Sequence, residues 1–451
     1  MPSARETLGF PALIETGMTV CYMRKSKVLR ISAGFFCFAA FCIWLAWANL
    51  QGAYAQPVVS ESGVAPAADE PVSFEVWLSE FLGEARQRDF SQEFLAATFS
   101  DVKPVPRVIE LDRKQPEFTQ TFWAYLNSRV SENRMRGGRQ RLKDHAALLR
   151  VIEKKYGVQG RFLVAFWGLE TNFGQFLGGF PVVDSLATLA HDKRRSAFFR
   201  AELFHALGVL SDRHIGQDKM IGSWAGAMGQ PQFMPSTFAG HAVDENGDGR
   251  KDVWTTLPDV FGSAANYLSH LGWDSRYTWG REVLLPDGFD LGLVSLSNKK
   301  PLKEWQALGI RRMDKRDLPT AEIDSAVILP AGVNGPAFLV YQNFEAILSW
   351  NRSLLYAVSV GHLADRLIGL GPLKSPRHEE RALSRDQVFD LQKLLNNLDH
   401  DAGEPDGQAG PQTRAAVKSF QKEAGLPPDG YPDGAVFDAI LATTKETEAT
   451  P

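Results

Sequence analysis

The sequence predicts a mainly α protein of the α+β class, with a small β region inserted in a large helical domain and a small three-helix module at the C-terminus. From Ser73 to about Trp273, apolar residues recur every three or four positions, which is the period of amphipathic helices. Between about Arg281 and Tyr341, short β-leaning runs alternate with Pro/Gly turns, which is typical of a small sheet. Two stretches rich in Pro divide the 451 residues into parts.

The N-terminus has the order of a secretion signal. A basic segment, Arg24–Arg30, precedes the uncharged apolar run Ile31–Trp47, and Ala53-Tyr54-Ala55 offers the small-x-small pattern that a signal peptidase cleaves. We therefore expect residues 1–55 to be a signal peptide, removed before Gln56, and the mature chain to lie in the periplasm.

Two further features of this segment affect the prediction. Glu6 and Glu15 do not fit a signal sequence, so we expect the true start to be Met23. The apolar run is long for a signal and short for a membrane span. An uncleaved anchor, which would make the protein membrane-associated, is the alternative.

Cysteine and charge content exclude several classes of function. Cys21, Cys37 and Cys42 all precede the cleavage site, so the mature chain would have neither disulfides nor cysteine chemistry. The formal net charge is −4, and no basic run interleaved with aromatic residues follows the signal. We therefore do not expect the protein to bind nucleic acid.

The expected domain organisation follows from these patterns. Residues 56–72 and 371–383 are linkers, residues 73–370 form the large domain, and residues 384–445 form the small module. Ser73 is the expected N-cap of the first helix. The other elements that we expect in the large domain are helices at Phe118–Asn133, Gln140–Tyr156, Arg161–Glu170, Ala197–Val209 and Asp259–Leu271, strands at Glu282–Leu285, Ala326–Leu329 and Phe338–Tyr341, and a last helix at Phe344–Leu367.

Glu170 is the first candidate for chemistry. It ends the helix Arg161–Glu170, which is apolar nearly all round and so is expected to be buried. Desolvation and the negative end of the helix dipole both disfavour the carboxylate, so both raise its pKa. A carboxyl group in this setting can donate a proton near neutral pH. The alternative is a surface glutamate with no role.

A glycine-rich segment, Gly222–Ser236, is the second candidate. Its glycines allow a backbone to approach a ligand closely. Polar Ser223, Gln230 and Gln232, with the apolar side chains of Trp224, Met228 and Phe233, provide the mixture that suits a sugar, which has apolar faces and a rim of hydroxyls. The alternative is a tight helix–helix turn.

These two segments resemble the lytic murein transglycosylase B family. The resemblance rests on Trp167-Gly168-Leu169-Glu170-Thr171, on Gly226-Ala227-Met228-Gly229 with Gln232-Phe233-Met234-Pro235, and on matches that run in order from about residue 73 to 370. It implies a lysozyme-like helical catalytic domain in which Glu170 is the acid/base. It also implies that Ser223, Gln232, Asn351 and Tyr356 line the substrate cleft and that Arg194 and Arg195 face the muropeptide. The chain departs from the pattern at Gln230-Pro231 and at Trp350.

An EF-hand-like spacing predicts a cation site. Oxygen-bearing residues fall at Asp244, Asn246 and Asp248, and at Arg250 through its carbonyl. The glutamate expected at the twelfth position is replaced by Thr255, so Asp259 is the candidate for closing the site. A structural calcium ion is the prediction; sodium or an empty loop is the alternative. The chemistry itself requires no cofactor.

The C-terminal module has its own signature. The run from Asp406-Gly407 through Gly410-Pro411 and Thr413 to Phe420-Gln421, followed by Asp429-Gly430, resembles the peptidoglycan-binding type 1 domain over nearly all of residues 384–445. Without that resemblance, the module would be read as a small three-helix packing domain.

Only one carboxyl group in the sequence has a convincing apolar setting. Ordinary glycoside hydrolysis uses two carboxylates, and Asp184, the next candidate, is better explained as a helix N-cap. A site with one carboxylate therefore favours a lyase over a hydrolase, and the resemblance implies a lytic transglycosylase that acts on peptidoglycan. We expect it to be a monomer that works beside cell-wall synthesis or division proteins. A lysozyme-like muramidase and a non-catalytic wall-binding scaffold are the alternatives.

Overall fold

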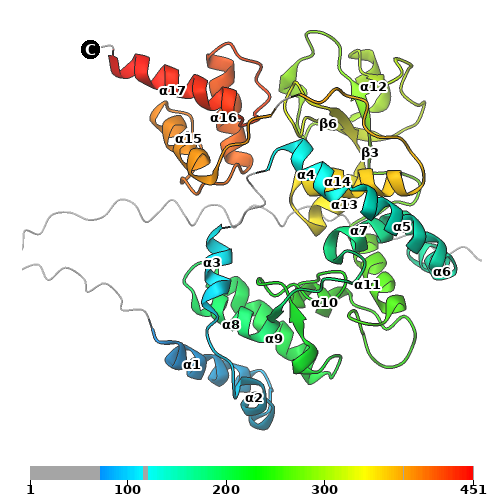
Figure 1. Cartoon of the computed structure of the whole chain (residues 1–451), viewed down its shortest axis with the longest axis vertical. Helices are drawn as coiled ribbons and strands as arrows, with labels where there is room; N and C mark the ends of the chain where they lie inside the picture. The colour runs from blue at the N-terminus through cyan, green and yellow to red at the C-terminus, as the bar shows by residue number, and fades with distance from the viewer. Residues whose placement is uncertain (1–71, 115–119, 379, 450–451) are drawn as a thin grey trace, which may run out of the picture. The chain divides into compact units, whose positions relative to one another are not determined.

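The computed structural model describes residues 72–114, 120–378 and 380–449 (Figure 1). The predicted signal peptide, the three cysteines and nearly all of the first predicted linker lie outside these residues. Within the described ranges, no helix has both the length and the apolar character needed to cross a membrane.

A first helical cluster surrounds α8 (Val182–His191) and α9 (Ser196–Ser211). Its core contains Phe81, Leu186, Leu203 and Phe238, all almost completely buried. As predicted, Ser73 caps the first helix, because its side chain accepts a hydrogen bond from the Val76 N–H. The other elements of this cluster are α1 (Phe74–Gln87), α2 (Gln92–Phe99), α3 (Pro106–Lys114), the short 3₁₀ helix Gln217–Lys219 and α10 (Pro235–His241).

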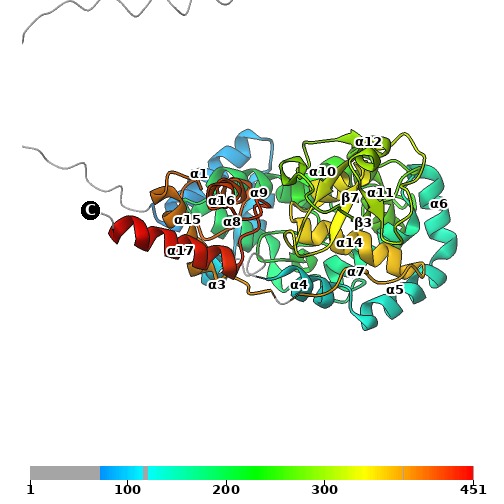
Figure 2. The same ribbon diagram turned by 90° about the horizontal axis from the view of Figure 1, so that it is seen from above.

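A second helical cluster is built around α7 (Gly160–Thr171), which packs against α14, α5, α6 and α11 (Figures 1 and 2). Nearly every residue of α7 from Phe162 to Gly168 is buried, as its all-round apolar sequence predicts. The other helices are α4 (Phe122–Arg129), α5 (Glu132–Asp144), α6 (Ala146–Tyr156), α11 (Leu257–His270), α13 (Gln342–Trp350) and α14 (Leu354–Leu367). The expected helix Gln140–Tyr156 is wrong as a single unit, because the chain breaks at His145 between α5 and α6.

The β region is a five-stranded antiparallel sheet of strand order β4-β6-β7-β3-β5. Alternate residues of its central strands face two cores: Phe338 and Val340 join the second helical cluster, while Leu339 joins a smaller core with Trp305. The elements are β3 (Gly280–Leu284), the 3₁₀ helix Leu291–Leu293, β4 (Lys300–Pro301), α12 (Leu302–Ala307), β5 (Arg311–Arg312), β6 (Asp324–Ile328) and β7 (Ala337–Val340). The three expected strands are thus confirmed within one or two residues.

Two smaller features position the candidate site. Strand β1 (Phe180–Pro181) pairs with β2 (Ile221–Gly222), so the chain that follows α7 is tied to the start of the glycine-rich segment. The single helix expected at Phe344–Leu367 is also wrong, since it divides at 351–353 into α13 and α14. The Ser353 side chain caps the new helix by accepting from the Tyr356 N–H.

The C-terminal module consists of α15 (Arg385–Asn397), α16 (Pro411–Glu423) and α17 (Gly434–Ala449) around a core of its own. Two buried glutamines brace its turns in the same way. Gln392 Oε1 accepts from the Gly407 N–H, and Gln421 Oε1 accepts from the Gly430 N–H, each at 2.8 Å. The Asp-Gly pairs of the sequence signature therefore hold the loops of the module in place.

Candidate active site

The end of α7 places Glu170 at a sharp change of chain direction. Asn172 (φ 49°) and Phe173 (φ 64°) both adopt the left-handed conformation, and the Asn172 N–H closes the helix on the Trp167 carbonyl. Gly174 follows at φ 77°, where a Cβ atom would lie 2.4 Å from Gln230 Oε1. Only glycine fits this approach, so the sequence fixes how α7 meets the glycine-rich segment.

Two hydrogen-bond donors hold the Glu170 carboxyl. Trp350 Nε1 donates to Glu170 Oε1 at 2.9 Å, and the Tyr356 hydroxyl donates to the same oxygen at 2.5 Å. Trp350 is the last residue of α13 and Tyr356 lies in the first turn of α14. The break between these two helices thus brings both donors to one oxygen.

Aromatic rings surround this contact. The Trp350 ring lies 4.4 Å from the Phe166 ring, measured between centroids, and 5.3 Å from both Phe233 and Tyr267. Glu170 is only partly exposed to solvent, and the atoms packed about its carboxyl exclude most water. Trp350 therefore orients the Glu170 carboxyl and helps to exclude water from it.

Burial raises the pKa of Glu170 to about 7, against opposing effects from Tyr356, Trp350 and the positive charge of Arg129. Desolvation also raises the pKa of Tyr356 well above its usual value, so its hydroxyl keeps its proton and acts as the donor. A carboxyl with a pKa near 7 can give up a proton and take it back at neutral pH.

No second acidic side chain contributes to this site within the described ranges. None is among the groups that shift the pKa of Glu170. Asp184 also has a raised pKa, caused by burial, but it lies inside the first turn of α8, and Pro181 occupies the cap position. Its expected role as an N-cap is therefore wrong.

The glycine-rich segment folds differently from part of its prediction. Gln230 is buried and braces the site, because its Oε1 accepts from Trp167 Nε1 at 2.6 Å and its Nε2 donates to the Trp254 carbonyl at 2.8 Å. Met228 and Phe233 are buried in the core and present no flat surface to a ligand. Of the three apolar side chains expected to face a sugar, only Trp224 is partly exposed.

Three predicted cleft residues keep unused polar groups. Gln232 (φ 52°) donates through Nε2 to the carbonyls of Leu177 and Gly229, which leaves its Oε1 without a partner among the described residues. The Ser223 hydroxyl accepts from the Ala227 N–H. Asn351 accepts from the Ser353 N–H through Oδ1, and its Nδ2 makes no hydrogen bond in the described part of the chain.

Arg194 and Arg195 converge on a residue that sequence reasoning missed. Both contact the carboxylate of Asp112, which is 1% exposed, and Arg194 does so at 2.7 Å. Arg113 contacts the same group at 3.1 Å. The sequence offers one clue to the burial of Asp112. It follows Val108 by four positions, so both residues lie on the same, buried face of α3. The cluster forms a fixed cationic surface in which both predicted arginines stay partly exposed.

The predicted cation loop brings several oxygens together. Asp244 Oδ1 and Asn246 Oδ1 both accept from the Asp248 N–H at 3.1 Å, and Asp248 Oδ1 accepts from the Arg250 N–H. The first two oxygens thus lie next to each other, as ligands of a hard cation would. Both Asp244 oxygens also accept from backbone N–H groups, Oδ1 from Gly247 and Oδ2 from Gly249, each at 2.7 Å.

Asp259 has a different place in this loop. Its side chain is fully buried, and its two oxygens accept from the N–H groups of Glu245, Asn246 and Asp252. It therefore anchors the two ends of the loop to α11. Within the described ranges, no three His, Cys, Asp or Glu side chains form a cluster that could hold a metal ion, so the donor set depends on Asn246 and on carbonyl oxygens as well.

Comparison with known proteins agrees with this geometry. Residues 73–365 match the Transglycosylase SLT domain family, and residues 384–440 match the peptidoglycan binding domain family. The structure is similar to that of SltB3 from Pseudomonas aeruginosa in complex with NAG-anhNAM-pentapeptide, with 43% sequence identity and a TM-score of 0.79. The match covers 82% of this chain and 99% of SltB3.

Two relatives from Escherichia coli are more distant. Membrane-bound lytic murein transglycosylase B is 32% identical over 221 residues, which are 46% of this chain and 56% of that relative. The lytic transglycosylase SLT35 in complex with calcium is 25% identical, with a TM-score of 0.57, covering 64% of this chain and 92% of SLT35. The match to the Transglycosylase SLT domain family covers residues 73–365, which is more than half of the chain and includes Glu170. This chain therefore belongs to that family.

Proposed function

We propose that this protein is a lytic transglycosylase that cleaves the β-1,4 bond between N-acetylmuramic acid and N-acetylglucosamine in peptidoglycan. The observation that carries the proposal is a single carboxyl group, Glu170, with a pKa of about 7 and with two donors fixed on one of its oxygens. Family membership and the similarity to SltB3 support the same reaction.

In this mechanism Glu170 first donates its proton to the leaving glycosidic oxygen. The resulting carboxylate then takes the proton of the muramic acid 6-hydroxyl, whose oxygen attacks C1 of the same sugar and closes a 1,6-anhydro ring. Because the nucleophile belongs to the substrate, no water needs to be activated. Trp350 and Tyr356 hold Glu170 Oε1 through both steps, and their hydrogen bonds stabilise the carboxylate between them.

The products distinguish this reaction from hydrolysis. Digestion of purified peptidoglycan in ¹⁸O-labelled water should release muropeptides that lack the label and are one water lighter than hydrolysis products, as measured by mass spectrometry. Reducing ends that carry ¹⁸O would instead make the protein a muramidase. A second carboxylate would then be required, because inverting and retaining hydrolases both use a pair.

We also propose the cleft residues. Ser223, Gln232 and Asn351 keep polar atoms that can meet sugar hydroxyls, and Tyr356 contacts Glu170 directly. Arg194 and Arg195 offer partly exposed guanidinium groups, which suit the carboxylates of a muropeptide.

The C-terminal module is proposed to hold the enzyme on its insoluble substrate. Deleting residues 384–451 should reduce binding to purified sacculi in a pull-down, while activity on short soluble glycans stays largely intact. The module has a separate hydrophobic core, so its removal should leave the core around α7 intact. Equal pull-down by the full and shortened chains would contradict this role.

A calcium ion is proposed for the loop at Asp244, Asn246, Asp248 and the Arg250 carbonyl. Asp259 anchors this loop through its hydrogen bonds to backbone N–H groups. The complex of SLT35 with calcium supports the choice of ion. Millimolar calcium should raise the melting temperature of the wild-type protein, because a ligand that binds only the folded state stabilises it. Asp248→Ala should abolish that rise, whereas Asp287→Ala, an exposed aspartate outside the loop, should keep it. An unchanged wild-type melting temperature would exclude a calcium site.

We propose a periplasmic location after cleavage before Gln56, because of the signal-like order at the N-terminus. The intact mass of protein recovered from the cell envelope tests this, and a mass that includes Ile31–Trp47 would indicate an anchor. The expected monomeric state and the contacts with cell-wall synthesis or division proteins belong to the same proposal. Cross-linking in the envelope, followed by mass spectrometry, measures both.

A further inference from the structure

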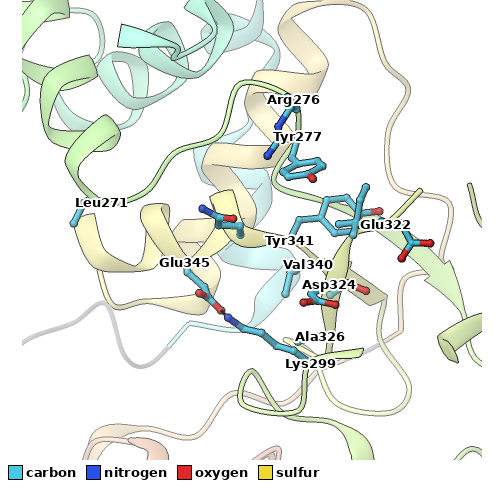
Figure 3. Close-up of a pocket in the computed structure, with 13 residues that line it drawn as sticks. Leu271, Arg276, Tyr277, Lys299, Glu322, Asp324, Ala326, Val340, Tyr341 and Glu345 are labelled. Atoms are coloured by element: carbon cyan, nitrogen blue, oxygen red, sulfur yellow. Dashed lines mark ion pairs between the residues drawn. The ribbon is translucent and has the colours of Figure 1, made fainter. Parts of the chain in front are cut away.

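A cavity of about 580 Å³ opens at the end of α13 that is remote from Glu170 (Figure 3). Its volume is in the range of small-ligand sites. Helix α13 begins at Gln342, beside the cavity, and ends at Trp350, on Glu170. Nine helical residues span about 13 Å, so the cavity is outside the reaction centre and still close to it. Its lining includes Arg276, Tyr277, Lys299, Glu322, Asp324, Tyr341 and Glu345.

The Tyr341 hydroxyl is a polar group without a partner at this cavity. Tyr341 is 7% exposed, and its backbone N–H donates to the Trp279 carbonyl, but its hydroxyl makes no hydrogen bond within the described residues. Burial raises the pKa of this phenol, so it is neutral and can donate. Because Tyr341 lines the cavity, a ligand atom there could accept a hydrogen bond from this hydroxyl.

Charges of both signs surround the cavity. Lys299 pairs with Glu345 at 2.6 Å, a contact drawn in Figure 3, and Arg276 pairs with Asp274 at 2.6 Å. Asp324 has no ion pair or side-chain hydrogen bond in the described part of the chain. Among the described residues, Glu322 makes one ion pair, a long one of 4.0 Å to Lys303. Asp324 is therefore unpaired and Glu322 is only weakly paired, so both can attract a cation, while Lys299 and Arg276 can meet an anion.

This arrangement matches a peptide end that carries an ammonium and a carboxylate. Figure 3 shows Tyr277 and Tyr341 on one side, with Lys299, Glu345 and Asp324 below them in the view. An ammonium group would lie between Asp324 and Glu322, where charge-assisted hydrogen bonds are available. A carboxylate would meet Lys299 or Arg276, and the Tyr341 hydroxyl would donate to a peptide carbonyl.

We propose that this cavity binds the stem peptide of the peptidoglycan substrate, through its free ammonium and carboxylate groups. The proposal rests on the function proposed above. An extended peptide of five residues reaches about 17 Å, which exceeds the length of α13. A stem attached next to the cleaved bond is therefore long enough to span the distance between Glu170 and the cavity.

The experiment compares two substrates that differ only in their stems. One is a set of soluble glycan oligosaccharides that carry stem peptides with a free amine, and the other is the same set after an amidase has removed the peptides. Asp324→Asn and Tyr341→Phe should each lower kcat/KM on the stem-bearing glycans roughly five- to tenfold, mainly through KM, which is the range for losing one such hydrogen bond. Neither should change kcat/KM on the bare glycans.

Asp287→Asn is the matched control, because it removes the same charge from an exposed turn outside the cavity. It should leave both substrates unchanged. Acetylating the stem amine should lower the wild-type kcat/KM as much as Asp324→Asn does, and should have no further effect on that variant. Equal losses on bare and stem-bearing glycans, or no loss on either, would overturn the proposal.

A direct measurement separates this inference from the proposed reaction. A free stem tripeptide ending in a diamino acid should bind the wild-type protein by calorimetry and should bind Asp324→Asn at least fivefold more weakly. If the wild-type enzyme forms no anhydro products, the proposed function fails, whatever this titration shows. If it forms them but the peptide does not bind, the cavity inference alone fails.

Discussion

Replacing Glu170 by glutamine should reduce the turnover of peptidoglycan by at least the roughly 10²–10⁴ typical of losing general acid–base catalysis. Glutamine keeps the shape of the side chain and can accept from Trp350 and Tyr356, but it cannot move a proton. The rate of muropeptide release under single-turnover conditions measures the effect. Binding to soluble glycans should survive, because the cleft residues are unchanged.

Asp184→Asn is the control for this variant. Asp184 lies in α8 and, like Glu170, has a pKa that burial raises. Its replacement should leave turnover within a few-fold of wild type. A comparable loss in both variants would indicate a two-carboxylate hydrolase and would contradict the single acid/base.

The same Glu170→Gln variant should be more stable than the wild-type protein at pH 8. Because the folded-state pKa is raised from 4.5 to about 7, the folded protein retains a proton that the unfolded chain has lost between these values. Wild-type stability therefore falls as the pH rises from about 4.5 to 7, and the full cost is present above pH 7. That cost is at most about 3.5 kcal/mol, since the pKa rises from 4.5 to about 7 and each pKa unit is worth about 1.4 kcal/mol.

Glutamine carries no charge at any pH and avoids this cost. The difference in free energy of unfolding between variant and wild type, from denaturant titrations, should therefore grow between pH 4 and pH 8. A difference that stays constant over this range would mean that the pKa of Glu170 is not raised. The expected result is that Glu170→Gln raises stability and lowers turnover, as is typical where a catalytic group is held in an unfavourable environment.

Sequence reasoning located Glu170 because its signal is local. An all-round apolar helix that ends in a glutamate predicts burial and a raised pKa, and both are present in the structure. The three-helix module was predictable for the same reason, since its caps and turn glycines are close in sequence to the helices they end. Local patterns thus gave most of the helices and the central strands.

The partners of Glu170 could not be predicted in this way. Trp350 and Tyr356 are 180 and 186 residues away along the chain, and the helical period runs through 351–353 without marking the break. Met228 and Phe233 have the apolar side chains of a sugar-binding surface, but both are buried in the core of the first helical cluster and pack there instead. Asp112 was missed because a lone aspartate carries no sign of the arginines that meet it in space.

The break between α13 and α14 has a consequence for how the chain becomes active as it folds. Both donors to Glu170 arrive from one short stretch of sequence, so they are gained or lost together. In a chain without that stretch in place, Glu170 is an ordinary solvated carboxyl on a helix end, unable to hold a proton at neutral pH. Contacts of such long sequence separation are slow to form because a long loop must close first, so we expect catalytic competence to be acquired after most of the helices exist.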